Sequence, residues 1–366
     1  MKQYRKENRY FKHIWICTVL LPAIIFIMAL TGCSGDGLIG SNENKAPKSI
    51  KIGVSIYDEY DTFVSCIVQN INELSKEKEN EENVTISLEI ASANGSQLTQ
   101  NDQVEKFIDK GCDVICVNLV DRTDATVIID KVKSADIPVV FFNRELVKED
   151  LERWDKLYYV GAVAELSGKM QARIITDALA DADRFREIDV NEDGTIQYVM
   201  LEGETGHQDA LVRTQVSVEK IKSAGFSVEK LGDEIANWNR AQAATKMNAL
   251  LEKYPWQIEM VIANDDDMAL GVIDTLEAAG AEHFPLIVGV NGTKDALEMI
   301  KTKKMEGTVY NDADGQAETI MNMAYGLAVE GKIPEDIKLE EDKYIYLPYR
   351  IINYDNVQSY IRKNTQ

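Results

Sequence analysis

The chain has 366 residues and a formal net charge of −21, from 61 acidic and 40 basic side chains. A surface of this sign repels the phosphate backbone, which excludes nucleic acid as a partner. About 320 residues follow the N-terminal leader described next, and this length is enough for two domains.

The first segment has the pattern of a secretory signal. Residues 1–13 are basic, residues 14–30 form an uncharged apolar run, and the sequence Leu30-Thr31-Gly32-Cys33 follows. A basic region, an apolar region and small residues at a cleavage point are typical of an export signal. The last four residues resemble a lipobox, the signal of bacterial lipoproteins, which implies cleavage before Cys33 and acylation of its sulfur.

An uncleaved membrane helix is the alternative, because 17 apolar residues are just within spanning length. The Gly-Cys pair and the polar stretch after it favour the lipoprotein, which two or more acyl chains hold stably on a bilayer. We therefore expect a signal peptide over 1–32 and a flexible tether over 33–48. The protein would be lipid-anchored on the extracytoplasmic face of the cell membrane.

The rest of the chain alternates short β-branched runs with amphipathic stretches. This alternation predicts an α/β fold of doubly wound parallel sheets with right-handed crossovers and helices on both faces. The predicted strands are 50–56, 85–90, 114–117, 139–142, 196–201, 259–263, 286–290 and 307–310. The predicted helices are 63–76, 102–110, 124–135, 163–179, 209–223, 240–253, 268–279 and 294–303.

Polar side chains follow six of the predicted strands. In parallel sheets, ligands bind beyond the carboxyl ends of the strands or between two domains. Each such residue could instead cap the helix that follows it, and this alternative stays open for every position. The residues are Asp61, Asn118, Asp121, Glu204, His207, Asp209, Arg213, Asn264, Asp265, Asp266, Asn291, Asn311 and Asp312.

This set of side chains indicates sugar binding. Adjacent sugar hydroxyls match the paired atoms of carboxylates, amides and guanidinium groups, and bidentate, charge-assisted bonds are strong. The C–H faces of the ring suit an aromatic pair, for which Phe63 and Trp238 are candidates. Trp238 stands in a loop before a predicted helix, although a core position is its alternative.

Several motifs make residues 51–363 resemble the bacterial galactose/glucose-binding protein family of type I periplasmic binding proteins. The motifs are 100–103 (QNDQ), 118–121 (NLVD), 139–143 (VVFFN), 158–161 (YYVG), 203–210 (GETGHQDA) and 307–313 (GTVYNDA). The resemblance implies two α/β lobes that close over a sugar on a three-strand hinge near 138–143, 309–312 and 347–350. The lobes would comprise 49–140 with 312–346, and 141–311 with 347–366.

The resemblance also implies the residues that contact D-glucose or D-galactose. Phe63 and Trp238 would stack on the ring. The hydrogen-bonding residues would be Asp61, Asn118, His207, Asp209, Arg213, Asp265, Asn291 and Asn311. The family usually has Asn at position 265 and Asp at 291, so this chain exchanges the two. The number of carboxylates is unchanged, but the epimer preference can differ because an amide donates and a carboxylate does not.

A second site is indicated by a loop at 189–197. Asp189, Asn191, Asp193, Gly194, Thr195 and Gln197 have the spacing of the first nine positions of an EF-hand loop. Position 12 is Met200 in place of the bidentate Glu, so this is not an EF-hand. The resemblance implies that Glu259 completes a structural Ca²⁺ shell, with the Thr195 carbonyl as one ligand. A turn built on Asp-Gly is the alternative.

Two further classes of protein compete with a transport protein. An exported sugar hydrolase could use carboxylates such as Asp61 and Asp209, but the chain shows no nucleophile motif, so we expect no enzyme. A sugar sensor that reports to a histidine kinase or chemoreceptor would share the fold and pocket. The favoured function is that of the binding protein of an ABC transporter, with a membrane permease as partner.

Overall fold

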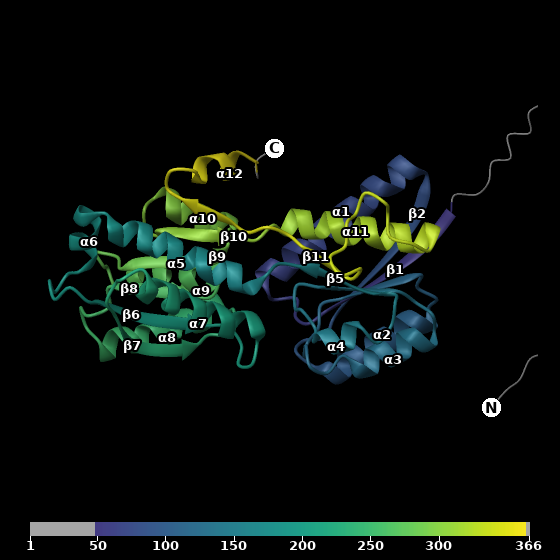
Figure 1. Cartoon of the computed structure of the whole chain (residues 1–366), viewed down its shortest axis with the longest axis horizontal. Coiled ribbons are helices and arrows are strands. Elements are labelled where there is room, and N and C mark those ends of the chain that lie inside the picture. The colour runs from purple at the N-terminus through teal and green to yellow at the C-terminus, as the bar shows by residue number, and fades with distance from the viewer. Residues whose placement is uncertain (1–47, 364–366) are drawn as a thin grey trace, which may run out of the picture. The chain divides into compact units, whose positions relative to one another are not determined.

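The computed structural model describes residues 48–363, which fold into two α/β lobes (Figure 1). Each lobe contains one six-stranded sheet. The α/β fold of two doubly wound sheets expected from the sequence is confirmed. The expected leader, tether and Cys33 lie outside the described residues. Within 48–363 no helix is long and apolar enough to cross a membrane.

The first lobe is built on an all-parallel sheet in the order β11-β5-β4-β3-β1-β2. Its strands are β1 (Lys48–Ile56), β2 (Val84–Ser92), β3 (Val114–Val117), β4 (Val139–Phe142), β5 (Leu157–Gly161) and β11 (Tyr344–Tyr346). Every residue of β3 and β4 is buried. Central parallel strands are apolar on both sides because helices cover both faces of the sheet.

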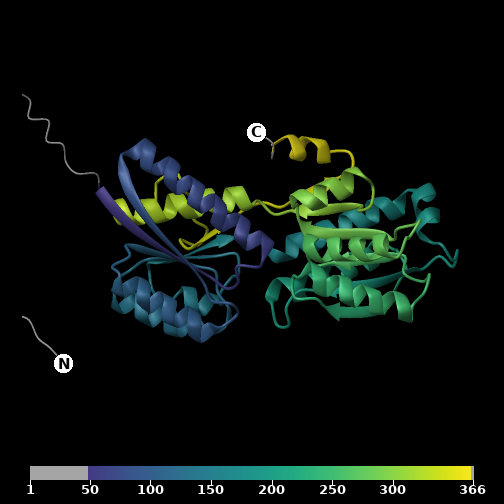
Figure 2. The ribbon, with the colours of Figure 1, turned by 180° about the vertical axis from the view of Figure 1, so that it is seen from behind.

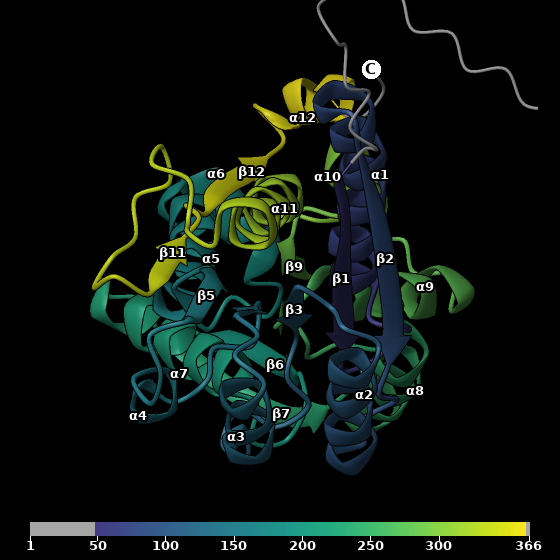
Figure 3. The same cartoon turned by 90° about the vertical axis from the view of Figure 1, so that its right-hand side faces the viewer.

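Two pairs of helices cover the first sheet (Figure 3). On one face α1 (Thr62–Glu82) packs beside α11 (Ala313–Glu330), although 230 residues lie between the end of α1 and the start of α11. On the other face lie α2 (Gln97–Asp109) and α3 (Thr126–Ser134). The short α4 (Lys148–Leu151) lies before β5.

The second lobe has the sheet order β12-β10-β9-β8-β6-β7, which is parallel except for the antiparallel edge strand β12. Its strands are β6 (Ile196–Glu202), β7 (Val228–Ile235), β8 (Met260–Ala263), β9 (Leu286–Asn291), β10 (Gly307–Tyr310) and β12 (Arg350–Asn353). The helices α8 (Arg240–Lys253), α9 (Asp266–Ala278) and α10 (Lys294–Lys301) cover one face, and α8 and α9 stand in front of the sheet in Figure 2.

The other face of the second sheet packs against helices that come earlier in the chain. They are α5 (Ala164–Ala180), α6 (Ala182–Ile188) and α7 (Gln208–Ser223). The last helix of the described residues, α12 (Val357–Lys363), follows β12 and lies near α10. Both lobes therefore have the same three-layer organisation around a parallel sheet.

The chain passes between the lobes three times, at 161–164, 310–313 and 346–350. The lobe boundary expected at residue 140, with a hinge segment at 138–143, is wrong. Residues 139–142 and 157–161 are strands β4 and β5 of the first sheet, so the first crossing follows β5. The backbone N–H of Leu347 donates to the carbonyl of Gly161 at 2.7 Å, which ties two crossings together.

Candidate functional site

Asp61 and Phe63 stand at the start of α1 in the first lobe. Asp61 caps the helix, because its Oδ1 accepts the N–H of Val64 at 2.8 Å, and its Oδ2 accepts the hydroxyl of Tyr57 at 2.5 Å. The ring of Phe63 is buried and belongs to the apolar cluster beneath α1. The capping alternative therefore holds for Asp61, and the same bonds fix the orientation of its carboxylate.

Asn118 is fully buried just after β3. Its Nδ2 donates to the carbonyl of Phe142 at 3.1 Å and to Oδ1 of Asn143 at 3.2 Å. Its Oδ1 accepts the N–H of Tyr57 at 3.3 Å. One amide thus joins the loops that follow β1, β3 and β4, and holds the carboxyl edge of the first sheet in place.

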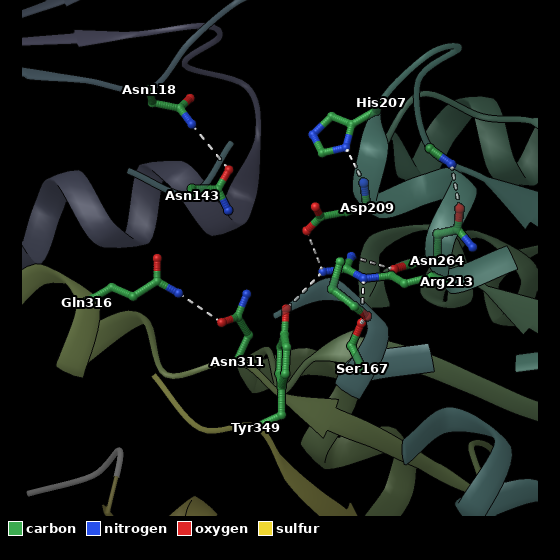
Figure 4. Close-up of polar contacts among 12 residues, drawn as sticks. Asn118, Asn143, Ser167, His207, Asp209, Arg213, Asn264, Asn311, Gln316 and Tyr349 are labelled. Atoms are coloured by element: carbon green, nitrogen blue, oxygen red, sulfur yellow. Dashed lines mark hydrogen bonds and ion pairs between the residues drawn. The ribbon is translucent and has the colours of Figure 1, made fainter. Parts of the chain in front are cut away.

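Arg213 lies on α7 and is the most heavily bonded side chain of the second lobe's edge. Its Nε donates to Oγ of Ser167 at 2.9 Å and its Nη1 to the carbonyl of Asn264 at 3.0 Å. Its Nη2 reaches Oδ2 of Asp209 at 3.2 Å and the hydroxyl of Tyr349 at 3.3 Å (Figure 4). Burial raises the pKa of Asp209, and the Arg213 charge opposes that shift.

His207 caps α7, because its Nδ1 accepts the backbone N–H of Asp209 at 3.1 Å. This bond assigns the ring proton to Nε2. Burial, reinforced by the charges of Arg144 and Arg213, lowers the pKa of His207 well below its ordinary value. At neutral pH the ring is therefore uncharged and offers one N–H donor at Nε2.

Trp238 lies between β7 and α8 with a positive φ of 58°. Its ring meets that of His207 edge to face, with centroids 5.0 Å apart. It packs so closely on Gly203 that a Cβ there would stand 2.0 Å from Cζ2. The indole is 9% exposed and belongs to an apolar cluster of the second lobe, so it is part of the core. Its contact with the His207 ring also places it beside the site.

Asp265 caps α9 by accepting the N–H of Met268 at 2.9 Å. It is buried, and that burial raises its pKa well above the ordinary value, with Asp267 and Asp61 adding smaller contributions of the same sign. The hydroxyl of Thr62, next to Asp61, donates to Asp267 of the same helix start, so the starts of α1 and α9 meet across the lobes.

Asn291 and Asn311 end the neighbouring strands β9 and β10. The N–H of Asn311 donates to the carbonyl of Asn291 at 3.2 Å, and Oδ1 of Asn311 accepts from Nε2 of Gln316 at 2.8 Å. Asn291 has a φ of 120°, a backbone conformation that non-glycine residues rarely adopt. Asn311 lies at a lobe crossing. Its backbone N–H is held by β9 of the second lobe, and its side-chain oxygen is held by α11 of the first.

Side chains of both lobes face a common space in Figure 4, with Asn118 and Asn143 on one side and His207, Asp209 and Arg213 on the other. In the described residues outside the three crossings, two side-chain hydrogen bonds join the lobes. Arg144 Nη2 contacts Glu204 Oε2 at 2.8 Å, and the hydroxyl of Thr62 donates to Asp267. The sequence-predicted residues of the two lobes are thus brought to one interface.

A cavity of about 380 Å³ opens at this interface, lined by residues 120–123, 144–145 and 204–209. Of the predicted site residues, His207 and Asp209 line it, and the other eight do not. Sequence reasoning missed Arg144, Glu145 and Arg122 as residues of the site. The available signal was position, since Arg122 directly follows the NLVD motif at 118–121 and Arg144 directly follows the VVFFN motif at 139–143.

The predicted metal loop folds back on its own backbone. Asp189 Oδ2 accepts the N–H of Gly194 at 3.0 Å, and Asp193 Oδ1 accepts the N–H of Thr195 at 2.7 Å. Asn191 Oδ1 accepts the N–H of Asp193 at 2.9 Å. The loop is therefore a compact turn whose side-chain oxygens accept from its own backbone.

Glu259 reaches this loop from just before β8. Its Oε1 accepts the N–H of Val190 at 2.8 Å, and its Oε2 accepts the N–H of Gln197 at 3.0 Å. Oxygen ligands of mixed carboxylate, amide and carbonyl type suit Ca²⁺. Within residues 48–363, however, no three His, Cys, Asp or Glu side chains are grouped closely enough to hold a metal. A bound cation would therefore need the amide oxygens of Asn191 and Gln197.

Two α/β lobes joined by three crossings, with polar groups of both lobes at their interface, define the class of two-lobe solute-binding proteins. Residues 52–333 match the family described as "Periplasmic binding protein domain". The chain belongs to this family, and the resemblance inferred from the sequence motifs is confirmed. The matched relatives are substrate-binding proteins and not enzymes, and the periplasmic family indicates an extracytoplasmic binding protein.

Known relatives and solved structures agree with this assignment. The chain is 33% identical over 347 residues to the D-galactose/methyl-galactoside binding periplasmic protein MglB of Haemophilus influenzae, covering 94% of this chain and 99% of that protein. It is 24% identical over 340 residues to the ribose import binding protein RbsB of Bacillus subtilis, covering 89% and 98%.

Among solved structures, the fold is similar to that of an ABC transporter solute binding protein from Bacillus halodurans with bound myo-inositol. The TM-score is 0.71 at 27% identity, and the match covers 87% of this chain and 99% of the other.

Proposed function

We propose that this protein binds a single pyranose, D-glucose or D-galactose, between its lobes. The observation that carries the proposal is the meeting of planar polar side chains from both lobes, with a neutral histidine donor and a buried Asp209–Arg213 pair at the second lobe's edge. The relative from Haemophilus influenzae, named for D-galactose and methyl-galactoside, supports the choice of sugar because it is matched over 99% of its length.

Each group has a role that its bonding in the structure permits. Asp61 and Asn118 would bind hydroxyls from the first lobe, and Asn311 would do so from the crossing. His207, Asp209, Arg213, Asp265 and Asn291 would bind them from the second lobe, while Phe63 and Trp238 would pack on the ring faces. Because Asp61, His207 and Asp265 are also helix caps, their side chains need little reorganisation to bind a ligand.

Binding would act through closure of the lobes. A sugar that contacts both lobes shifts the balance between open and closed forms by its preference for the closed one. The closed surface would then be recognised by the permease of an ABC transporter. The solved relative with myo-inositol, an ABC transporter solute binding protein, supports this partner.

The proposed anchor is the acylated Cys33 on the extracytoplasmic face of the membrane. The lipobox-like Leu30-Thr31-Gly32-Cys33 supports it. In cells, Cys33→Ser should move the protein from the membrane fraction to the soluble or secreted fraction. Retention of the Cys33→Ser protein in the membrane fraction would favour an uncleaved apolar helix.

We also propose that the 189–197 loop and Glu259 hold a structural Ca²⁺. The ligands would be Asp189, Asn191, Asp193, the Thr195 carbonyl, Gln197 and Glu259. Glu259 already contacts both ends of the loop through Val190 and Gln197, which supports the set. The ion would offset the negative charges of Asp189, Asp193 and Glu259 within one lobe.

The experiment that tests the sugar proposal is a thermal-shift screen against a panel of monosaccharides, followed by calorimetry. We expect micromolar or tighter binding of glucose or galactose. Absence of heat and of any thermal shift with every common hexose would remove the proposal. Tightest binding of a pentose or of an inositol would keep the class of function and change the substrate.

A further inference from the structure

Tyr349 lies in the third crossing, directly before β12, and its side chain is buried. Its ring belongs to an apolar cluster of the second lobe. The same cluster contains Ala162 from the first crossing and Val309, which directly precedes the second. All three crossings therefore join the second lobe at one apolar cluster.

The Tyr349 hydroxyl points from this cluster toward Arg213 (Figure 4). It accepts from Arg213 Nη2 at 3.3 Å. Arg213 Nε donates to Oγ of Ser167 at 2.9 Å, and the Ser167 hydroxyl donates in turn to the carbonyl of Ala164 at 2.7 Å. Ala164 ends the first crossing and begins α5. The guanidinium group is thus connected to two of the crossings, through one side chain each.

These bonds determine what Arg213 can offer to a ligand. A guanidinium group carries five N–H donors in one rigid plane. Within the described residues four donors have partners: Nε bonds Ser167, Nη1 bonds the carbonyl of Asn264, and Nη2 bonds both Asp209 and Tyr349. One N–H of Nη1 is left for a sugar hydroxyl. Because the plane is rigid, the other four bonds fix the direction of this donor.

The third crossing is stiff where Tyr349 joins it. The N–H of Leu347 is bonded to the carbonyl of Gly161 at 2.7 Å, and Pro348 alone stands between Leu347 and Tyr349. The proline ring fixes its own φ, so this short segment has little freedom. A displacement of the crossing would therefore reach Arg213 through the Tyr349 hydroxyl.

We infer that Tyr349 is a positioning residue for sugar binding, whose hydroxyl orients Arg213 toward one sugar hydroxyl and connects it to the third crossing. The inference rests on the proposed sugar-binding function and adds a residue that acts through Arg213. The ring of Tyr349 is held in the core, so it needs no contact with the sugar. A donor that is already oriented loses less freedom on binding, and this raises the affinity.

The test is calorimetry on the full protein, with the hexose that binds best and with its singly deoxygenated analogues. Tyr349→Phe keeps the ring and should weaken hexose binding about fivefold, as expected for one ordinary hydrogen bond. With the analogue that lacks the hydroxyl bound by Arg213, the same substitution should change the affinity less than about twofold, because the two losses are coupled. A purely structural role would weaken the binding of all analogues alike.

Ser167→Ala identifies the same sugar hydroxyl independently, because it removes another partner of Arg213. It should weaken the binding of the hexose and spare the same analogue. Tyr198→Phe is the matched control, since Tyr198 on β6 is a buried tyrosine of the same apolar cluster. It should bind every ligand as the wild type does.

An unchanged hexose affinity of Tyr349→Phe, or an equal loss with every analogue, would overturn the positioning role. If the losses in Tyr349→Phe and Ser167→Ala vanished with different analogues, the role would also be overturned, because Tyr349 would then contact the sugar itself. In each of these cases, binding of the hexose by the wild type would still uphold the proposed function. Failure of every sugar to bind the wild type would remove the function and the positioning role together.

Discussion

Arg144 of the first lobe and Glu204 of the second form an ion pair across the lobe interface, with Nη2 and Oε2 2.8 Å apart. The Arg144 guanidinium also lies 3.4 Å from the centre of the Tyr57 ring, and its Nη1 donates to the carbonyl of Val120. The Tyr57 hydroxyl in turn donates to Asp61. A contact between the lobes is thereby connected to a carboxylate proposed to bind the sugar.

Removing the charge of Glu204 should weaken ligand binding. A contact made only between the lobes favours the closed form, so its loss raises the free energy of closure. For Glu204→Gln we expect about threefold to tenfold lower affinity for the hexose, the size of one ordinary hydrogen bond, because solvent screens the partly exposed ion pair. Calorimetry measures it, and the deficit should shrink at high salt, because Glu204 is partly exposed and screened.

Glu219→Gln provides the control, since Glu219 lies on the exposed side of α7 in the same lobe. It should bind the hexose as the wild type does. An unchanged affinity of Glu204→Gln would show that the ion pair does not contribute to closure.

Trp238→Ala should weaken hexose binding by at least about 2 kcal/mol, the range of aromatic residues that dominate an interface. Hexose should also change the tryptophan fluorescence. Since the indole packs on Gly203 and the core, the alanine variant should melt at a lower temperature too. Trp238→Phe separates the two effects, because it keeps an aromatic face.

The exposed Trp256, at 95% exposure, serves as the control for that experiment. Trp256→Ala should keep both the affinity and the sugar-dependent fluorescence change. A fluorescence change that disappears in Trp256→Ala and persists in Trp238→Ala would contradict the placement of Trp238 at the sugar.

Removal of Ca²⁺ should lower the melting temperature, because a ligand bound only by the native state stabilises it by mass action. We expect EDTA to lower the melting temperature of the wild type and to have little effect on Glu259→Gln, which has lost a proposed ligand. Glu229→Gln, at an exposed position of β7 in the same lobe, should respond like the wild type. Identical melting curves of the wild type with EDTA and with Ca²⁺ would refute the metal site.

Stability should fall with rising pH because of Asp266. Burial raises the pKa of its carboxyl to about 7, against the opposing hydrogen bonds from Thr308 and Thr293. An unfolded aspartate titrates at about 3.9. Between these values the folded state keeps a proton that the unfolded state has lost, so the free energy of unfolding declines as pH rises from about 4 to about 7.

Asp266→Asn should flatten this decline in urea unfolding measured over that pH range, because the amide does not titrate. The free energy of unfolding of Asp266→Asn at a single pH is a poorer readout, because the substitution also replaces one acceptor oxygen of the carboxylate with an NH2 donor. Asp102→Asn on the exposed side of α2 should keep the wild-type slope. Parallel slopes for Asp266→Asn and the wild type would contradict a buried protonated carboxyl.

The buried strands could be predicted from the sequence more closely than the edge strands. The bounds 114–117, 139–142 and 307–310 match β3, β4 and β10, because short apolar runs between polar residues are typical of central parallel strands. β7 was missed because its sequence VEKLGDEI is charged and none of its residues is buried at the sheet edge. α11 was also missed, and its Gly315 and Gly326 lower the helix propensity of the segment.

Sequence reasoning could predict only those site residues whose position follows from the end of a single strand. The rule that ligands lie beyond the carboxyl ends selects Asp61, His207 and Asp265, and it cannot separate capping from binding because these residues cap their helices in the structure. The partnership of Arg144 with Glu204 depends on two lobes meeting, and a local pattern carries no information on such a contact. The lobe boundary was misplaced for a related reason, since β5 joins the first sheet by pairing with β4.

The first lobe is made from two separate stretches of chain, and α11 from the later stretch packs against α1 from the earlier one. A chain still under synthesis cannot finish this core until about residue 346 has emerged, because β11 completes the sheet. The late arrival of α11 and β11 therefore delays completion of the first lobe until nearly the whole polypeptide has been made.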